Sequence, residues 1–196
     1  MIFSVGYQPV LKITKQNVMK GLIMTLLLWT MTLPTVGQSY RTAVCELSFF
    51  SNAPLEDIKA NNKEAIGVFN AATGDIALVV QIRGFQFAKS LMQEHFNENF
   101  MESEEFPRAT FEGKVKKFDM EKSGSQNVDV SGDMTIHGVK KPMDISGRFE
   151  VRNGIVFMDA VFPIRLEDHD IEIPQILFKK IAEEVEVTVH FELKKD

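Results

Sequence analysis

The sequence contains one cysteine, one tryptophan and two tyrosines among its 196 residues. With a single cysteine no internal disulfide can form, and we expect Cys45 to be a small core residue because unpaired cysteines are commonly buried. Trp29 lies in the N-terminal region, and Tyr40 is the only tyrosine after residue 37, so phenylalanine supplies nearly all remaining aromatic surface. Phenylalanine has no hydrogen-bonding group, which disfavours a sugar-stacking surface and favours an apolar interior.

Catalytic motifs are also absent from the sequence. It has no glycine-rich phosphate loop, no paired-cysteine zinc spacing and no nucleophile elbow. Two weak metal candidates are His95, beside Glu94 and Glu98, and His169, which stands between two aspartates. Because charged loops of this kind are usually only solvated, the sequence predicts no catalytic residue, no metal site and no cofactor. A metal-assisted hydrolase at one of these histidines is the least favoured alternative.

The N-terminal segment has the layout of a secretory signal peptide. Three lysines precede the apolar run 21–33, and small residues follow it. The run is shorter than the about 20 apolar residues that cross a membrane. We therefore expect residues 1–37 to be removed near Gly37, and the mature protein to be periplasmic or secreted and not membrane-spanning. Translation from Met19 would give a more usual short signal, and the choice between the two starts is open.

The remaining residues, 38–196, are acidic. Removal of residues 1–37 leaves 19 basic and 27 acidic side chains and a net charge of −8. This charge disfavours nucleic acid and anionic lipid surfaces as partners. The length suits one domain with its own core and is too short for two. A homodimer of this domain is compatible with the sequence.

Alternation of apolar and polar residues dominates 38–196. In 127–138 the residues Val128, Val130, Met134 and Ile136 share one face, which predicts a half-buried antiparallel strand. Further strands are expected at 74–83, 108–118, 143–151 and 184–194, with weaker alternation at 41–50, 64–70 and 155–165. About eight such strands favour an all-β, eight-stranded antiparallel barrel, because closure buries the apolar faces and removes exposed edges. A two-sheet sandwich is the competing arrangement.

Two segments interrupt the alternation. Apolar residues recur at helical spacing between residues 85 and 100, which predicts a short amphipathic helix between two strands. Residues 173–181 show the same spacing, and Pro174 suits a first helical turn. We expect these one or two short helices to cover the barrel, with mobile lids as the less favoured alternative because few loops gate ligands.

Glycines occupy three inward positions where a filled barrel would hold large side chains: Gly113, Gly132 and Gly147. If Val139 and Lys140 form a two-residue turn, Gly132 lies opposite Gly147 across the hairpin. The glycines then either leave free volume for a ligand or permit the strong coiling that a barrel needs. The sequence does not separate these two interpretations.

A ligand-binding interior would be lined by the inward residues of the strands and by apolar residues near the inserted helix. We expect its entrance on the side of that helix. The predicted channel residues are Ile76, Leu78, Val80, Ile82, Phe87, Leu91, Phe96, Phe100, Phe106, Phe111, Gly113, Val115, Val130, Gly132, Met134, Ile145, Gly147, Phe149, Val187, Val189 and Phe191.

Two stretches carry the motifs of a known family. Residues 95–111, HFNENFMESEEFPRATF, lead from a helix through an aromatic-proline pair into a strand. Residues 134–143, MTIHGVKKPM, follow the hairpin pattern hydrophobic-Thr-hydrophobic-His-Gly-Val-x-Lys-Pro. In this order and spacing the two stretches resemble the YceI-like family, and the resemblance covers most of residues 41–196. Segment 49–58 resembles a shorter variant of the early strands, without the usual histidine-containing segment.

This resemblance implies a lipocalin-like barrel that is exported to the periplasm and holds a polyisoprenoid or another long apolar molecule. It brings no catalytic residues, and His137, Gly138, Lys141 and Pro142 match the hairpin motif in a position that fixes the turn. The sequence thus predicts an exported lipid-binding protein for transport, storage or envelope stress protection. An isoprenoid-quinone-like molecule is one candidate for the bound lipid. A structural envelope protein with a filled barrel is the alternative.

Overall fold

The computed structural model describes residues 38–52, 57–173 and 182–196. The predicted signal peptide lies outside these residues, and so does nearly all of the helix predicted at 173–181. The described residues all belong to the compact unit Gly37–Asp196.

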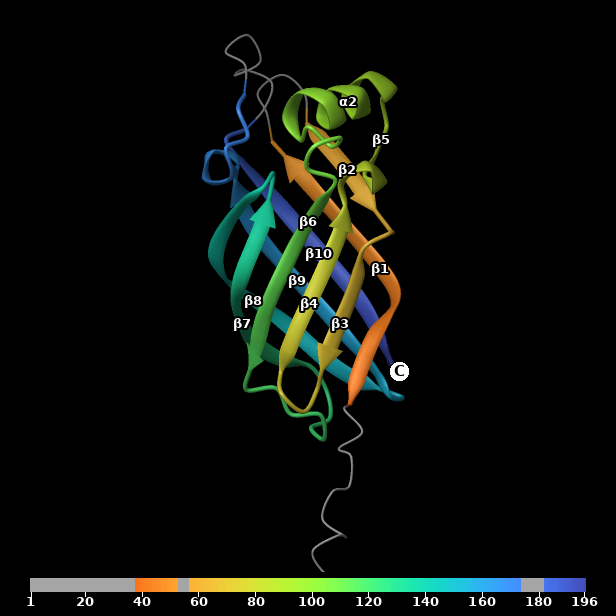
Figure 1. The fold of residues 1–196 in the computed structure, drawn as a ribbon. Coiled ribbons are helices and arrows are strands. Elements are labelled where there is room, and N and C mark those ends of the chain that lie inside the picture. The colour runs from red at the N-terminus through yellow and green to blue at the C-terminus, as the bar shows by residue number, and fades with distance from the viewer. Residues whose placement is uncertain (1–37, 53–56, 174–181) are drawn as a thin grey trace, which may run out of the picture. The chain divides into compact units, whose positions relative to one another are not determined.

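Eight antiparallel strands close into a barrel (Figure 1). In ring order they are β1 (Ser39–Ser51), β3 (Ile66–Asn70), β4 (Asp75–Gln81), β6 (Arg108–Lys116), β7 (Gln126–Ile136), β8 (Val139–Arg152), β9 (Ile155–Arg165) and β10 (Glu184–Lys195). The ring closes because β10 pairs with β1 from Tyr40–Lys195 to Phe50–Glu186. This pairing confirms the predicted barrel and is incompatible with two separate sheets.

One side of the barrel carries a two-strand extension. β1 is long enough to pair with β3 through Ser39–Arg41 and with β2 (Ile58–Asn62) through Leu47–Ser51. β5 (Gln86–Phe87) then pairs with β2, while the single turn η1 (Ile82–Gly84) separates β5 from β4.

Asn62 supports the backbone where this extension departs from the barrel. Its side-chain amide donates to the carbonyl of Gln81 at 2.8 Å and accepts from the amide of Glu64 at 2.8 Å. The residue is 1% exposed, so these bonds satisfy polar groups that would otherwise be buried without partners.

The alternation along the strands places their apolar residues in the barrel interior. Val128, Val130, Met134 and Ile136 on β7 are all buried, as the period of two predicts. Cys45 is buried too, where it pairs in register with Phe191, and burial raises the pKa of its thiol. The core interpretation of Cys45 is therefore confirmed.

The hairpin between β7 and β8 differs from the prediction. Ile136 pairs with Val139, so the two-residue turn is His137-Gly138 and not Val139-Lys140. Both turn residues have positive φ, 51° and 74°, as in the primed turns that match the twist of hairpin strands. The pairing is therefore shifted, and Gly132 lies opposite Met143 on β8.

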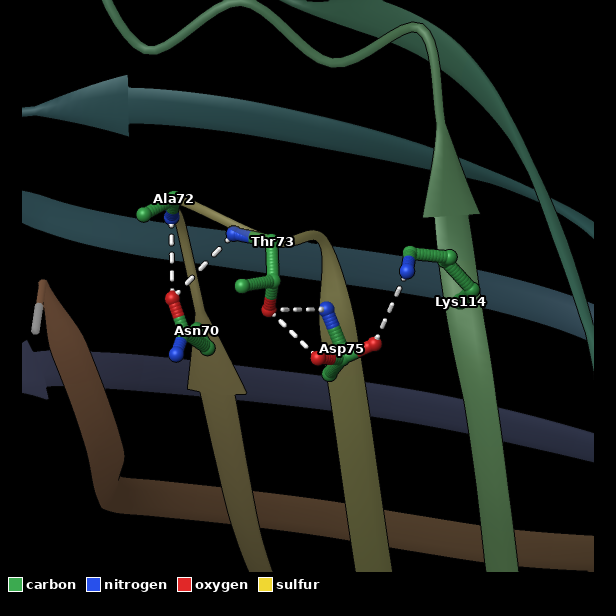
Figure 2. A network of polar contacts seen from close by, with 5 residues as sticks. All are labelled: Asn70, Ala72, Thr73, Asp75 and Lys114. Carbon is green, nitrogen blue, oxygen red and sulfur yellow. Dashed lines mark hydrogen bonds and ion pairs between the residues drawn. The ribbon is translucent and has the colours of Figure 1, made fainter.

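A polar network holds the turn between β3 and β4, at the end of the barrel remote from the helical segment (Figures 1 and 2). The side-chain oxygen of Asn70 accepts from the amides of Ala72 and Thr73. The Thr73 hydroxyl donates to Asp75, and Lys114 on β6 lies 3.3 Å from the same carboxylate. The hydrogen bond from the Thr73 hydroxyl, and after it the contact with Lys114, hold the pKa of Asp75 below its usual value.

Candidate functional site: an apolar cavity beneath the helical segment

A short helical segment lies at one end of the barrel (Figure 1). It consists of α2 (Ser90–His95) followed by the π-helical turn η2 (Phe96–Phe100). The amide of Met101 donates to the carbonyl of Phe96 at 2.9 Å, the wide i→i+5 spacing of that turn. The helix predicted over 85–100 therefore exists but begins only at Ser90, because Gln86–Phe87 pairs with β2 as β5.

A cavity of about 470 Å³ lies between this segment and the inward side chains of the adjoining strand ends. Its lining residues in the described chain are nearly all aliphatic, aromatic or methionine, and none is acidic. The exceptions are Ser51, Lys89, His95 and Thr110. Leu91 on α2 also lines the cavity although it is 62% exposed. The cavity therefore reaches the surface beside α2.

Four phenylalanines form one cluster at this end of the barrel: Phe49, Phe85, Phe87 and Phe96. Phe96 is central, with ring centroids 5.5 Å from Phe49, 5.5 Å from Phe85 and 5.0 Å from Phe87. All four rings line the cavity. This mouth cluster joins β1, the β4–β5 connection, β5 and η2 into one apolar wall.

A second aromatic cluster fills the opposite half of the barrel. It consists of Tyr40, Phe69, Phe118 and Phe149, with neighbouring centroids 5.4–6.4 Å apart. Phe69 is only 1% exposed, and none of the four lines the cavity. We call this group the base cluster. The interior is thus open at the helical end and packed at the other.

The structure brings about half of the predicted channel residues to the cavity. Those that line it are Leu78, Val80, Ile82, Phe87, Leu91, Phe96, Phe100, Phe111, Met134, Val187 and Val189. They come from the helical segment and from the strand ends nearest to it, which agrees with an entrance on that side.

The other predicted channel residues lie elsewhere. Six are buried side chains in the packed half: Ile76, Val115, Val130, Ile145, Phe149 and Phe191. The ring centroid of Phe106 lies 4.5 Å from that of His137, and Phe106 does not line the cavity. Alternation correctly predicted that the six strand residues face inward. It carries no information on which positions along the barrel axis are filled by side chains.

The three glycines provide no free volume. A Cβ atom at Gly132 would lie 2.3 Å from the carbonyl oxygen of Glu112. At Gly113 it would lie 2.8 Å from the ring of Phe111, and at Gly147 it would lie 2.9 Å from the carbonyl oxygen of Asp159. None of the three lines the cavity. The free-volume interpretation is therefore wrong, and the glycines permit close approach of coiled strands.

Sequence reasoning missed many of the lining residues. They are Leu47, Phe49, Ser51, Ile58, Phe85, Lys89, Met92, His95, Met101, Ala109, Thr110, Ile136, Phe162, Ile164, Leu166, Ile171 and Val185. Ile136 shares the inward face predicted for its strand, and Ala109 and Val185 lie within predicted strands, so their strand ends gave a usable signal. The sequence did not show which strand ends adjoin the helical segment.

Two histidines connect the β7–β8 turn to its surroundings. Nδ1 of His137 lies 3.2 Å from the carbonyl oxygen of His169, and its Nε2 lies 3.0 Å from the carboxylate of Glu102. His169 is 5% exposed and its Nδ1 lies 3.2 Å from the carbonyl oxygen of Val139. His137 therefore fixes the hairpin, as its place in the motif predicted, and His169 points into the protein and not toward its flanking aspartates.

Metal-ligating residues do not gather in the described part of the chain, where no group of three or more histidine, cysteine or acidic residues could hold a metal ion. Among the same residues, no helix combines the length and the apolar character needed to span a membrane.

Comparison with known proteins gives a family and several similar folds. Residues 48–193 match the family model of the YceI-like domain, whereas no curated protein matches the sequence. A polyisoprenoid-binding domain from Saccharophagus degradans, implicated in plant cell wall breakdown, has 16% identity and a TM-score of 0.70, covering 82% of this chain and 99% of its own.

Two further solved structures share the fold. BcnA of Burkholderia cenocepacia has 16% identity and a TM-score of 0.65, covering 76% of this chain and 95% of its own. The YceI protein of Campylobacter jejuni has 16% identity and a TM-score of 0.60, covering 74% and 90%. At these identities the structural similarity shows a common barrel.

Proposed function

This chain belongs to the YceI-like family, and from that premise we propose that the cavity beneath α2 binds the apolar chain of a lipid. The observation that carries the proposal is the cavity of about 470 Å³ whose lining side chains are almost all apolar. Burial of a hydrocarbon chain there contributes roughly 0.8 kcal/mol per methylene. The polyisoprenoid class is suggested by the Saccharophagus degradans domain, which is described as binding such molecules.

The polar residues of the cavity lining favour lipid binding over catalysis. The Ser51 hydroxyl accepts the amide of Ala182 at 3.1 Å, which engages it with the backbone. His95, the lining histidine, lies on the exposed side of α2. We therefore propose a carrier, store or envelope-protective protein that holds its lipid unchanged.

A filled structural barrel is the second candidate, and one observation favours it. Phe111 and strand backbone occupy the space beside Gly113 and Gly132, which an empty channel would have left open. The cavity at the opposite end favours binding. Lipid binding is therefore proposed for the helical end only.

Lipid analysis of the purified full chain tests this function. We expect protein purified without detergent to yield one class of apolar lipid in an organic extract analysed by mass spectrometry. The stripped protein is then loaded with the fluorescent dye 1-anilinonaphthalene-8-sulfonate. It should release this dye when it takes up polyprenol. An extract without lipid, together with failure of polyprenol to displace the dye, would contradict the proposal and favour the filled barrel.

We further propose that residues 1–37 direct export and are removed, so that residues 38–196 act in the periplasm or outside the cell. The lysines before the apolar run 21–33 and the small residues after it support this. The intact mass of protein released by osmotic shock should match a chain that begins near Gln38. A full-length mass confined to the cytosolic fraction would overturn the export proposal without affecting lipid binding.

A further inference from the structure

The cavity ends at two side chains that lie over glycines. The ring of Phe111 lines the cavity, and it occupies the space in which a Cβ at Gly113 would stand. Leu78 also lines the cavity, and its Cδ2 lies 2.6 Å from the position of a Cβ at Gly67. Leu78 pairs in register with both Gly67 and Phe111. The two side chains therefore lie side by side across β4 and β6.

Below these two residues the interior is packed. Ile76 is the next inward residue of β4, and it pairs with Gly113 and with Phe69 of the base cluster. Phe69 and Phe191 are each 1% exposed. Phe69 contacts Phe149 edge-on at 6.1 Å. A hydrocarbon chain that reaches Phe111 and Leu78 therefore meets packed side chains and no continuing channel.

We propose that Phe111 and Leu78 form a floor that sets the length of chain the barrel accepts. This inference rests on the proposed function and deepens it. The lipid enters beside α2, its apolar end stops at the floor, and any longer remainder stays outside the cavity. The volume of about 470 Å³ lies within the roughly 300–1,000 Å³ typical of sites for small ligands. The protein thus selects short chains, or only the terminal part of a longer polyisoprenoid.

A series of linear alcohols from octanol to eicosanol tests the floor in the full chain. Their affinities are measured by displacement of 1-anilinonaphthalene-8-sulfonate from stripped protein. Each added methylene should raise affinity about fourfold while it enters the cavity. Once the chain reaches the floor, the gain should stop, and the affinity should stay level for longer alcohols.

Two substitutions should move this limit in opposite directions. Phe111→Ala removes the ring that lies over Gly113, and should move the limit to alcohols longer by about three methylenes. Val189→Phe adds a ring on the cavity side of β10 opposite Ala160, and should move the limit to shorter alcohols. The two results do not depend on each other, so a folding defect in one variant leaves the other informative.

Matched substitutions on the outer face of the barrel serve as controls. Phe157→Ala and Val161→Phe make the same chemical changes on β9 at residues absent from the cavity lining, and should leave the limit unchanged. The proposal that Phe111 and Leu78 set the chain length is wrong if the affinity keeps rising through eicosanol, or if both cavity variants keep the wild-type limit. Lipid binding itself would stand in either case. If no alcohol displaces the dye from wild-type protein, the proposed function itself fails.

Discussion

Ala109→Trp is expected to weaken lipid binding strongly while leaving the barrel folded. Ala109 lies on β6, lines the cavity and pairs in register with Val80, another lining residue. An indole at this position would occupy the space of the ligand chain. Loss of about four buried methylenes, at about 0.8 kcal/mol each, lowers affinity about 200-fold. Mass spectrometry of the extracted variant and dye displacement by polyprenol measure the effect.

Ala77→Trp is the matched control for this variant. Ala77 lies on β4 next to the lining residue Leu78, faces outward and is exposed. The same indole there should leave lipid uptake unchanged. Because residues 38–196 contain no tryptophan, each variant also carries a single tryptophan in that region, whose fluorescence reports whether the variant is folded. Wild-type lipid content in a folded Ala109→Trp protein would contradict binding in this cavity.

The barrel could be predicted from the sequence because strand alternation is a local property. Each inward residue of β7 is separated from the next by one polar or small residue, and that period alone assigns the face. The hairpin register failed although its signal was local as well. His137-Gly138 has a glycine at the second turn position, which primed turns favour, whereas Val139-Lys140 has no residue suited to positive φ.

The site was only partly predictable because it depends on how far each side chain reaches along the barrel. Gly113 looked like an empty position, yet the ring of Phe111, two residues away on the same strand face, fills that space. No pattern in the sequence reports this contact. The helical segment shows the same limit, since pairing of Gln86–Phe87 with β2 keeps these two residues out of the predicted helix, which begins only at Ser90.

Gly132→Ala is expected to destabilise the barrel by about 4 kcal/mol or more, at the upper end of single substitutions. The added Cβ would lie 2.3 Å from the carbonyl oxygen of Glu112 and 2.6 Å from Cα of Gly113. Both atoms are backbone of β6, so relief requires separation of β6 from β7. Urea unfolding followed by far-ultraviolet circular dichroism measures the free energy of unfolding.

Gly124→Ala separates this steric effect from the general effect of replacing a glycine. Gly124 has φ of 81°, and a Cβ added there would have no atom within 4 Å, so only backbone strain of about 1 kcal/mol is expected. Equal, small losses in both variants would mean that β6 and β7 can separate without penalty. Close approach at Gly132 also holds Phe111 beside Met134, its partner in register and a second lining residue. The folded fraction of Gly132→Ala should therefore bind lipid more weakly than Gly124→Ala, because the contact that tightens the barrel also shapes the floor of the cavity.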